Sequence, residues 1–491
     1  MGWPERPAGI REEDLTAPKR VLVFTFADVG SRMASPAMRM WEICRVLGQH
    51  CEVVLMSANT IPTQAPGFRL VSYSRAAIKD LGRWADVVVV DQETYRRYPR
   101  VGRFDRPLAI DLTYPTLIEN LELKRQWESL DAWQQSFKMQ FQRPEYLEPL
   151  RRGDFFFTAS PRQRDFNLGL LTALGRVNPL TYYNDLELRQ LIEVIPFGVP
   201  TEPPQHTQNV LRGVVPGIDR DDFLLLWAGG VWAWFDPWTL LEAMARMRSS
   251  LPRVKLYFMG ITPPHPEIRW FPFNDRLLER ARRLGVLDRN VFINTGWVEY
   301  HDRANYLVEA DVGITTQAAH LETHLAVRTR AFDYIWGGLP LLMTTGDWLS
   351  DWAERTGLGL SIPPHNVGAL VEAIRRLAED EPLCRQMRER VREQAREWTW
   401  ERVSQPLVEF CLHPFFAADR TFREKFDGKP RWRLEPKYHW TVLRRSGFKE
   451  FLRSFESLLP LRRIRVAFRD EGLRAGFRAL RTELRFSGPV P

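Results

Sequence analysis

The sequence is poor in cysteine, and its cysteines have none of the spacings that mark a metal site. The 491 residues include four cysteines, at positions 44, 51, 384 and 411. No two of them form a CxxC pair, and no histidine follows in zinc-finger register. The pattern therefore favours reduced thiols in a cytosolic protein over a disulfide framework or a structural zinc site.

Long apolar runs are also lacking. The longest, FLLLWAGGVWAWF at 223–235, has 13 residues, whereas a membrane-spanning helix takes roughly 20. The first residues, MGWPERPAGIREEDLTAPKR, contain no apolar stretch typical of a signal peptide. We expect a protein that does not span a membrane, located in the cytoplasm or resting on the inner face of the cytoplasmic membrane.

Most of the chain lacks an excess of either charge. Residues 421–491 carry 18 Lys and Arg against 8 Asp and Glu, an excess of ten positive charges. Because the net charge of the whole chain is +8, residues 1–420 have a net charge of −2. Much of this tail reads as a basic amphipathic helix, either packed on its own domains or in contact with anionic lipid. Nucleic-acid binding is not expected, because the charge is confined to one end and no nucleic-acid module is present.

Two signatures of nucleotide and metal chemistry are absent. The loop after the first predicted strand, FADVGSRMASP, contains one glycine, Gly30, and so is not a GxGxxG fingerprint. It is interpreted either as an ordinary strand-to-helix turn or as a loop that offers backbone N–H groups to an anion. We identify no DxD-type aspartate cluster that would bind a metal, so we expect neither a metal nor another cofactor.

The chain does contain two series of short, continuous apolar runs, which are separated by helix-like stretches. They lie at 20–26, 51–57, 85–91, 107–112 and 154–160, and again at 223–230, 254–260, 291–296, 310–316 and 339–344. Strands buried on both faces of a parallel sheet have this pattern. The predicted fold is α/β, with two Rossmann-like doubly wound domains facing a cleft.

A Pro- and Gly-rich stretch divides the two series of runs. The predicted organisation is a flexible tail (1–19), an N-terminal domain (20–200), a linker (201–221), a C-terminal domain (222–398), and C-terminal helices with a basic extension (399–491). Helices are expected to begin with Ser35 as N-cap before Pro36, and again at Asp236-Pro237.

Several ionisable residues gather in HLETHLAVRTRAFDYIWGGLPLLMT, residues 320–344. Helical spacing from His324 places Arg328 one turn later, with Glu322 just before, at the helix N-terminus. There the helix dipole favours an acid by about 0.3–1 kcal/mol, so a structural role is the alternative. Arg328 and Arg330 are interpreted as surface charges or as site residues; their place at the cleft end of two predicted strands favours a site.

Two strand-end loops are further candidates. In the first, Gly229 and Gly230 permit close backbone approach, and Trp232, Trp234 and Phe235 either pack in the core or wall the cleft and stack on a ring. In the second, NTGWVEY, backbone groups from Gly296 through Trp297 to Val298 are placed to read the edge of a nucleobase.

The order of these predicted strands, loops and helices along the chain resembles that of the family 4 glycosyltransferases, which have the GT-B architecture. The match runs from about residue 20 to about residue 410 and is strongest in LLLWAGG, VKLYFMG, VFINTGWV and LETHLAVRTRAFDYIWGGLPLLMT. Relatives carry two glutamates separated by seven residues. Here the second acid matches Asp333 and the first matches Glu322, and ten residues lie between them. The motif RTRxxDYxWxGLP resembles that of a branch of bacterial cell-surface polysaccharide enzymes.

The resemblance implies a retaining transfer of a sugar from a nucleotide-diphosphate donor to a glycan or lipid-linked acceptor. It places Glu322 beside the donor sugar, Asp333 on the ribose hydroxyls and the Gly296–Val298 backbone at the base. Asp111 stands where many relatives have a histidine facing the donor sugar, or else is a strand-end acid capping a helix. The Gly30 loop occupies the corresponding place in the first domain.

One departure from the family concerns the diphosphate. Relatives usually have an arginine and a lysine at the positions of Gly230 and Phe235. Arg328 and Arg330 are the predicted substitutes, because a guanidinium matches phosphate geometry. Two other interpretations stay open: a GT-B enzyme of another class, such as a sugar-nucleotide epimerase or a phosphorylase, and a non-catalytic relative that binds a glycan or a partner.

Overall fold

The computed structural model describes residues 17–58, 65–127, 131–232, 234–262 and 272–426, with residues 440 and 443–445. Residues up to Ala418 belong to one compact unit, which holds both domains, and Asp419 begins a second. Of the second unit, α18 (Arg420–Phe426) is described. The predicted basic amphipathic helix beyond it falls outside the described residues.

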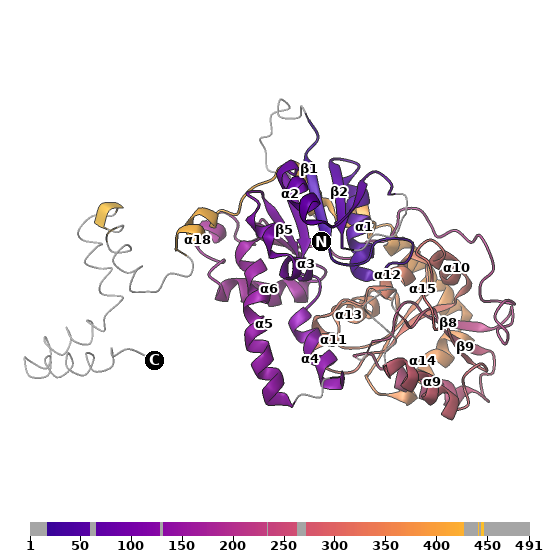
Figure 1. Ribbon diagram of the computed structural model, residues 1–491. Coiled ribbons are helices and arrows are strands. Elements are labelled where there is room, and N and C mark those ends of the chain that lie inside the picture. Colours follow the sequence, from indigo (N-terminus) through magenta and orange to yellow (C-terminus); the bar gives the residue numbers. More distant parts are fainter. Residues whose placement is uncertain are drawn as a thin grey trace, which may run out of the picture. The chain divides into compact units, whose positions relative to one another are not determined.

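Two all-parallel sheets organise the larger unit (Figure 1). The first has seven strands in the order β3-β2-β1-β4-β5-β6-β7: β1 (Arg20–Thr25), β2 (Glu52–Ser57), β3 (Arg69–Ser72), β4 (Val87–Asp91), β5 (Leu108–Asp111), β6 (Phe155–Thr158) and β7 (Ile192–Val194). The second has six in the order β10-β9-β8-β11-β12-β13: β8 (Phe223–Trp227), β9 (Val254–Phe258), β10 (Val291–Ile293), β11 (Val312–Thr315), β12 (Leu341–Thr344) and β13 (Gly359–Ile362).

Helices connect the strands and cover both sheets. Those of the first domain are α1 (Ser35–Leu47), α2 (Arg75–Trp84), α3 (Gln92–Arg97), the 3-10 helix η2 (Pro99–Arg103), α4 (Thr116–Trp127), α5 (Ala132–Arg152), α6 (Pro161–Ala173) and α7 (Pro179–Tyr182). The second domain has α8 (Pro237–Met247), α9 (Pro272–Arg283), α10 (Arg303–Glu309), α11 (Leu321–Leu325), α12 (Arg330–Trp336), α13 (Trp348–Thr356), α14 (Val367–Glu379) and α15 (Glu381–Ala395), before α16 (Trp400–Val403) and α17 (Gln405–Leu412).

The strands read as unbroken apolar runs because each sheet is buried on both faces. Along β1, Val21 and Val23 enter one hydrophobic cluster while Leu22 and Phe24 enter another, as the two-residue side-chain period requires. The predicted α/β architecture with two doubly wound parallel sheets is confirmed. Every predicted strand contains an observed one.

Two details of the predicted helices differ. Ala34, not Ser35, is the N-cap of α1, and it makes no side-chain capping bond; the Ser35 hydroxyl instead accepts a hydrogen bond from Tyr114 at 3.3 Å. The expected helix through His324 and Arg328 is broken, because α11 ends at Leu325 and α12 starts at Arg330.

The chain crosses back to the first domain after α15. Trp400 is buried, and the rings of Phe155 and Phe410 stack at 5.0 Å between centroids. Helices α16 and α17 pack against α1. Within the described parts of the chain, no helix is both long and apolar enough to cross a bilayer.

Candidate active site

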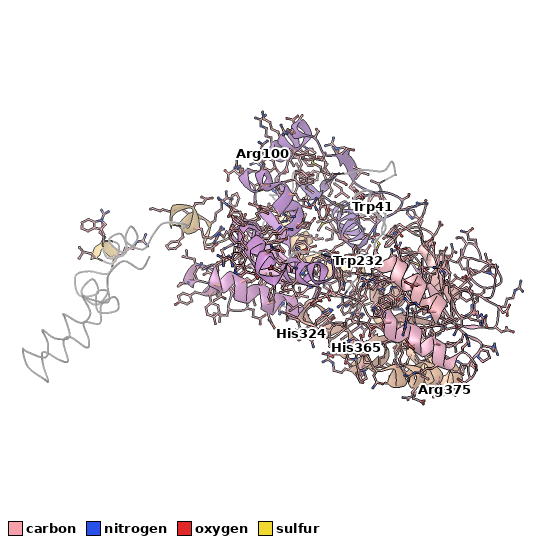
Figure 2. All side chains as sticks on the ribbon, turned by 60° about the horizontal axis from the view of Figure 1, so that its bottom comes forward. Trp41, Arg100, Trp232, His324, His365 and Arg375 are labelled. Carbon is pink, nitrogen blue, oxygen red and sulfur yellow. The ribbon has the colours of Figure 1, made fainter. Side chains whose placement is uncertain are left out.

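Strand order fixes where the candidate site lies. Each sheet reverses its winding direction beside its first strand, between β1 and β4 and between β8 and β11. Ligands of doubly wound sheets bind at such switch points, beyond the carboxyl ends of the strands. The loops after β1, β8 and β11 meet here around a cavity of about 300 Å³. Trp232 lies where the violet ribbon of the first domain meets the pink ribbon of the second (Figure 2).

The cavity collects most of the predicted site residues. Eight of them line it: Gly229, Gly230, Trp297, Val298, Glu322, Arg328, Arg330 and Asp333. Gly30, Gly296 and Asp111 do not. Gly30 is buried in the loop after β1, next to Ser31, whose carbonyl accepts a hydrogen bond from the Tyr300 amide at 2.7 Å. The amide of Gly296 donates to Asn294 at 3.0 Å.

Glu322 and Arg328 form a buried bidentate ion pair. Both Nη atoms of Arg328 donate to the carboxylate, at 3.1 Å and 2.9 Å, and the side chains are 1% and 3% exposed. Burial alone lowers the pKa of Arg328, but the charge of Glu322 raises it above its ordinary value. Arg328 therefore lines the cavity with its positive charge largely neutralised by the Glu322 carboxylate.

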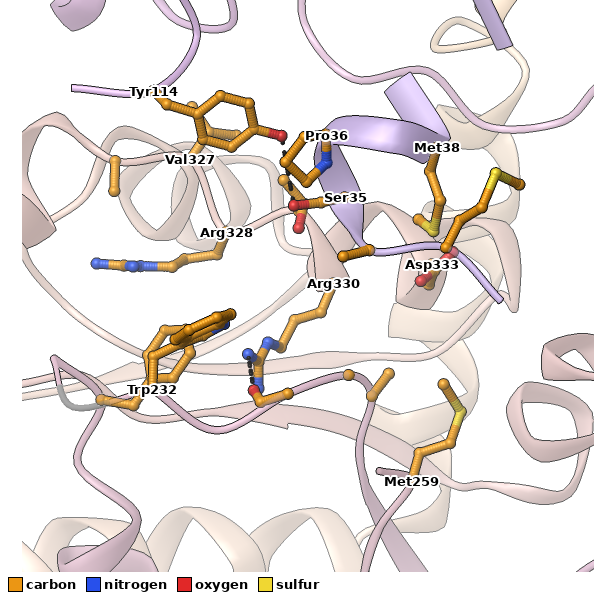
Figure 3. Close-up of a pocket in the computed structure, with 18 of the residues that line it drawn as sticks. Ser35, Pro36, Met38, Tyr114, Trp232, Met259, Val327, Arg328, Arg330 and Asp333 are labelled. Atoms are coloured by element: carbon orange, nitrogen blue, oxygen red, sulfur yellow. Dashed lines mark hydrogen bonds between the residues drawn. The ribbon is translucent and has the colours of Figure 1, made fainter. Parts of the chain in front are cut away.

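Arg330 differs from Arg328 in having no carboxylate partner among the described residues. Its Nη2 donates to the Gly230 carbonyl at 2.7 Å (dashed in Figure 3), and Nη1 has no hydrogen-bond partner there. The guanidinium lies 4.4 Å from the ring centroids of both Trp227 and Phe235. Burial lowers the pKa of Arg330 to about 10, so it remains a cation at neutral pH.

The position of Arg330 answers the departure noted in the sequence. The Arg330 guanidinium contacts both Gly230 and Phe235, the two positions at which the resemblance predicts cations. A positive group therefore lies beside these two residues but comes from a different segment of the chain. Such an arrangement suits an anion entering the cavity.

Asp333 lines the cavity in partnership with Arg303. The Arg303 Nε donates to its carboxylate at 3.2 Å, and Nη1 donates to the Tyr300 carbonyl at 2.6 Å. Burial raises the pKa of Asp333, against the lowering effect of Arg303. Asp333 therefore lines the cavity with one of its carboxylate oxygens held by Arg303.

The aromatic loop after β8 walls the cavity. Trp232 and Trp234 stack at 5.3 Å with planes 3° apart, and both line the cavity. His320 fixes the loop: the Thr323 amide donates to its Nδ1 at 3.1 Å, which leaves Nε2 to donate to the Trp234 carbonyl at 3.2 Å. The predicted cleft-wall role of these residues agrees with their placement.

Asp111 lies in the interior of the first domain. Its carboxylate accepts from Arg39 Nε at 2.7 Å and from the Thr113 hydroxyl at 2.5 Å, with no exposure of either charged side chain. It contributes to a neighbouring cavity that shares Trp232 and Trp234 with the first. Its predicted catalytic role stays a prediction.

Glu119 is a cavity acid that the sequence analysis did not single out. It lies in the first turns of α4 and lines both cavities. Burial raises its pKa to about 8, and the nearby negative charge of Glu322 adds to the rise. Glu119 is therefore protonated at neutral pH and able to donate a hydrogen bond. The spacing of residues in the sequence could not indicate this role, because Glu119 lies on α4 in the first domain whereas Glu322 lies in the second.

Among the described residues, no group of three or more His, Cys, Asp or Glu side chains is arranged so that it could hold a metal ion. The expectation that no metal or other cofactor is needed stays a prediction.

Comparison with family models and with curated proteins finds no match. Solved structures do match. One is WaaG, a glycosyltransferase involved in lipopolysaccharide biosynthesis, at 17% identity and TM-score 0.53, covering 80% of this chain and all of the other. A second is sucrose-phosphate synthase from Thermosynechococcus elongatus, at 14% and 0.55, covering 80% and 98%. A third is Anabaena Alr3699/HepE in complex with UDP-glucose, at 12% and 0.57, covering 81% and 100%.

At these identities the likeness concerns the fold. The two parallel-sheet domains are those of the GT-B glycosyltransferases, as the resemblance implied. Membership of family 4 and of a polysaccharide branch stays a prediction.

Proposed function

We propose that this protein is a retaining glycosyltransferase that moves a sugar from a nucleotide-diphosphate donor to a glycan or lipid-linked acceptor in cell-surface polysaccharide synthesis. The observation that carries the proposal is Arg330, a buried cation without a carboxylate partner among the described residues, in a cavity at the switch points of two Rossmann-like domains. Support comes from structural neighbours solved with UDP-glucose and with UDP.

Arg330 would hold the diphosphate. Its unpartnered Nη1 is available to a phosphate oxygen, and stacking on Trp227 and Phe235 fixes the plane of the guanidinium. Charge that builds on the leaving diphosphate would be stabilised by a group that does not have to reorganise. Arg328 would act mainly through Glu322, because its charge is already paired.

Glu322 would hydrogen-bond the donor sugar near its anomeric carbon, and Asp333 would bind the ribose hydroxyls. The backbone from Gly296 to Val298 would meet the base. In the transfer, the bond between the anomeric carbon and the diphosphate oxygen breaks. The acceptor hydroxyl oxygen bonds to that carbon on the same face, and its proton passes to the leaving phosphate. The protein then contributes positioning and charge stabilisation.

A thermal-shift screen against UDP-, GDP-, ADP- and dTDP-sugars tests donor binding directly. A true donor at 100 times its dissociation constant raises the free energy of unfolding by about 2.7 kcal/mol. Arg330→Ala is expected to weaken that donor by about 10- to 100-fold, the range for a hydrogen bond to a charged group. Arg330→Lys keeps the charge and serves as the conservative control. Unchanged affinity in both Arg330→Ala and Arg328→Ala would exclude the diphosphate role.

Glu322→Gln separates transfer from binding. We expect a strong fall in sugar transfer with the nucleotide still bound, because the carboxylate faces the sugar and not the phosphates. Glu299→Gln is the matched control, since Glu299 lines the same cavity but is half-exposed and lies 3.6 Å from Arg32. Normal turnover in Glu322→Gln would mean that the site has been assigned to the wrong residues.

A non-catalytic glycan- or partner-binding role is the second candidate, and the loss of the usual cation pair at Gly230 and Phe235 favours it. Failure of the chain to bind any nucleotide sugar would support it. Release of free nucleotide on mixing donor with acceptor distinguishes a transferase from an epimerase of the same fold. We also propose a cytoplasmic location, with contact between the basic tail and the inner membrane face.

A further inference from the structure

The first half of α5 contains no fully buried residue. The buried residues of this helix are Tyr146, Pro149 and Leu150, all in its second half. Helices in proteins are stabilised mainly by burying one face, and in residues 132–145 that face is only half-buried, at Gln135, Met139 and Gln142. A capping box between Asp131 and Gln134 closes the N-terminus. Figure 1 shows this part of α5 extending away from the first sheet.

Three aromatic side chains form one face of this projecting segment. Trp133, Phe137 and Phe141 are 74%, 53% and 68% exposed. Their four-residue spacing stacks them along one side of the helix. Ring centroids are 5.7 Å apart for the first pair and 5.0 Å for the second, so the rings form a continuous patch. Single exposed apolar residues are ordinary, but a contiguous patch of this kind marks an interaction surface.

We propose that this aromatic face of α5 binds the surface of an anionic lipid bilayer. The segment Ala132–Arg143 contains no acidic residue, and its remaining polar residues are Gln and Ser. At 100° per residue, Lys138 and Arg143 fall on opposite flanks of the aromatic face. Trp and Phe on one side of a helix with basic residues on its flanks is the arrangement that enters the headgroup region and contacts anionic lipid.

The same charges disfavour a second copy of the chain as the occupant. In a symmetric pairing, the aromatic faces of two α5 helices would meet with their basic flanks side by side. The segment offers no acid to pair with Arg143 of the other copy, so the contact would carry like-charge repulsion. A bilayer with anionic headgroups instead complements both flanks.

The face lies close to the cleft along the chain. Gln142, which follows Phe141, and Tyr146 line the second cavity together with Trp232 and Trp234, from the side of the helix opposite the aromatic face. A bilayer held by α5 would therefore bring a lipid-linked acceptor to the helix that lines this part of the cleft. That consequence rests on the proposed function, whereas lipid binding by α5 does not.

Co-sedimentation of the full-length protein with vesicles tests the proposal without any substrate. The vesicles contain roughly three parts phosphatidylglycerol to seven parts phosphatidylcholine, with pure phosphatidylcholine as comparison. The triple variant Trp133→Ser, Phe137→Ser, Phe141→Ser is expected to lower the partition coefficient about tenfold or more. The matched control is Tyr183→Ser, Leu186→Ser, which removes apolar side chains that are 73% and 68% exposed elsewhere in the domain; its binding should equal that of the wild type.

The double variant Lys138→Glu, Arg143→Glu provides a second test that leaves the aromatic residues in place. It is expected to bind the anionic vesicles several-fold more weakly and to show a smaller salt dependence of binding than the wild type. Wild-type binding in both α5 variants would overturn the proposal and assign the membrane contact to another surface, such as the basic tail. A wild-type chain that ignores vesicles but forms a dimer that the triple variant abolishes would also overturn it, in favour of a second copy. Because donor binding is measured separately, failure here leaves the proposed transferase activity standing, and the reverse also holds.

Discussion

At the scale of single residues, the cleft combines charges that are neutralised with charges that are not. Arg328 shares its charge with Glu322 through two hydrogen bonds, while the partners of the Arg330 guanidinium among the described residues are one carbonyl and two rings. Glu119 faces the same pair from the first domain and holds its proton at neutral pH. The cavity can thus accept a dianion at Arg330 and donate a hydrogen bond from Glu119.

Glu119 predicts a specific dependence of stability on pH. Its pKa rises from an ordinary value near 4.5 to about 8 on folding. Between these values the unfolded chain loses the proton while the folded protein keeps it, so stability is fully present below the lower value and is lost as pH rises toward 8. In Glu119→Gln this contribution is absent. The variant should therefore gain stability relative to wild type between pH 5 and pH 8.

Urea denaturation of both proteins at pH 5, 6.5 and 8 measures this difference. Asp91 and Asp347, whose pKa values burial raises to about 6, titrate in both proteins and cancel. A difference in unfolding free energy that stays constant across the three pH values would contradict the raised pKa of Glu119.

At the scale of secondary-structure elements, the sequence predicts every central strand and the edge strand β10, and it misses the other three edge strands. The missed strands are β3, β7 and β13, and all three are edge strands. An edge strand is short and covered on fewer sides, so it needs no continuous apolar run; β3 reads RLVS and has no buried residue. The segment from Glu322 to Asp333 was predicted as the site, but its break into α11 and α12 was not, because the turn is set by contacts with the other domain and with β12.

The ion pair between α1 and β5 leads to a prediction at this scale. Arg39 binds Asp111 and also donates to the carbonyls of Ile195 and Pro196, at 2.8 Å and 3.1 Å, so it joins a helix to the ends of two strands. Asp111→Asn leaves a fully buried guanidinium without its counter-charge and is expected to cost about 3–5 kcal/mol of stability.

Asp86→Asn is the matched control for this pair. Asp86 binds Arg20 with side chains 33% and 41% exposed, and an exposed pair contributes less than about 1 kcal/mol. Turnover of Asp111→Asn is then measured at a temperature where the variant is folded. A normal kcat there would remove Asp111 from the catalytic residues and leave it a structural role, while equal stability losses in the two variants would contradict the structural role.

At the scale of the whole molecule, the second domain is not the end of the folded unit. The compact unit runs to Ala418, and α16 and α17 return to the first domain, where Leu407, Val408 and Phe410 join the hydrophobic cluster that contains Val21 and Val23. The sequence predicted C-terminal helices from residue 399 on, but not which domain they cover. That choice depends on contacts between residues 200 or more apart in the sequence, which no local pattern encodes.

Truncation tests this long-range packing. A chain ending at residue 398 loses Trp400, which is 4% exposed and lies against Gly198 so closely that a Cβ there would collide with it. It also loses the stacked partner of Phe155. Removing several fully buried side chains at about 1.5–3 kcal/mol each would consume most of a typical folding free energy. We therefore expect the first domain to unfold cooperatively at a much lower temperature, whereas a chain ending at Ala418 keeps these contacts and should melt close to the full-length protein. Equal melting temperatures of the two truncations by calorimetry would contradict this expectation. They would mean that packing of α16 and α17 on the first domain does not stabilise it, and that the first domain folds without them.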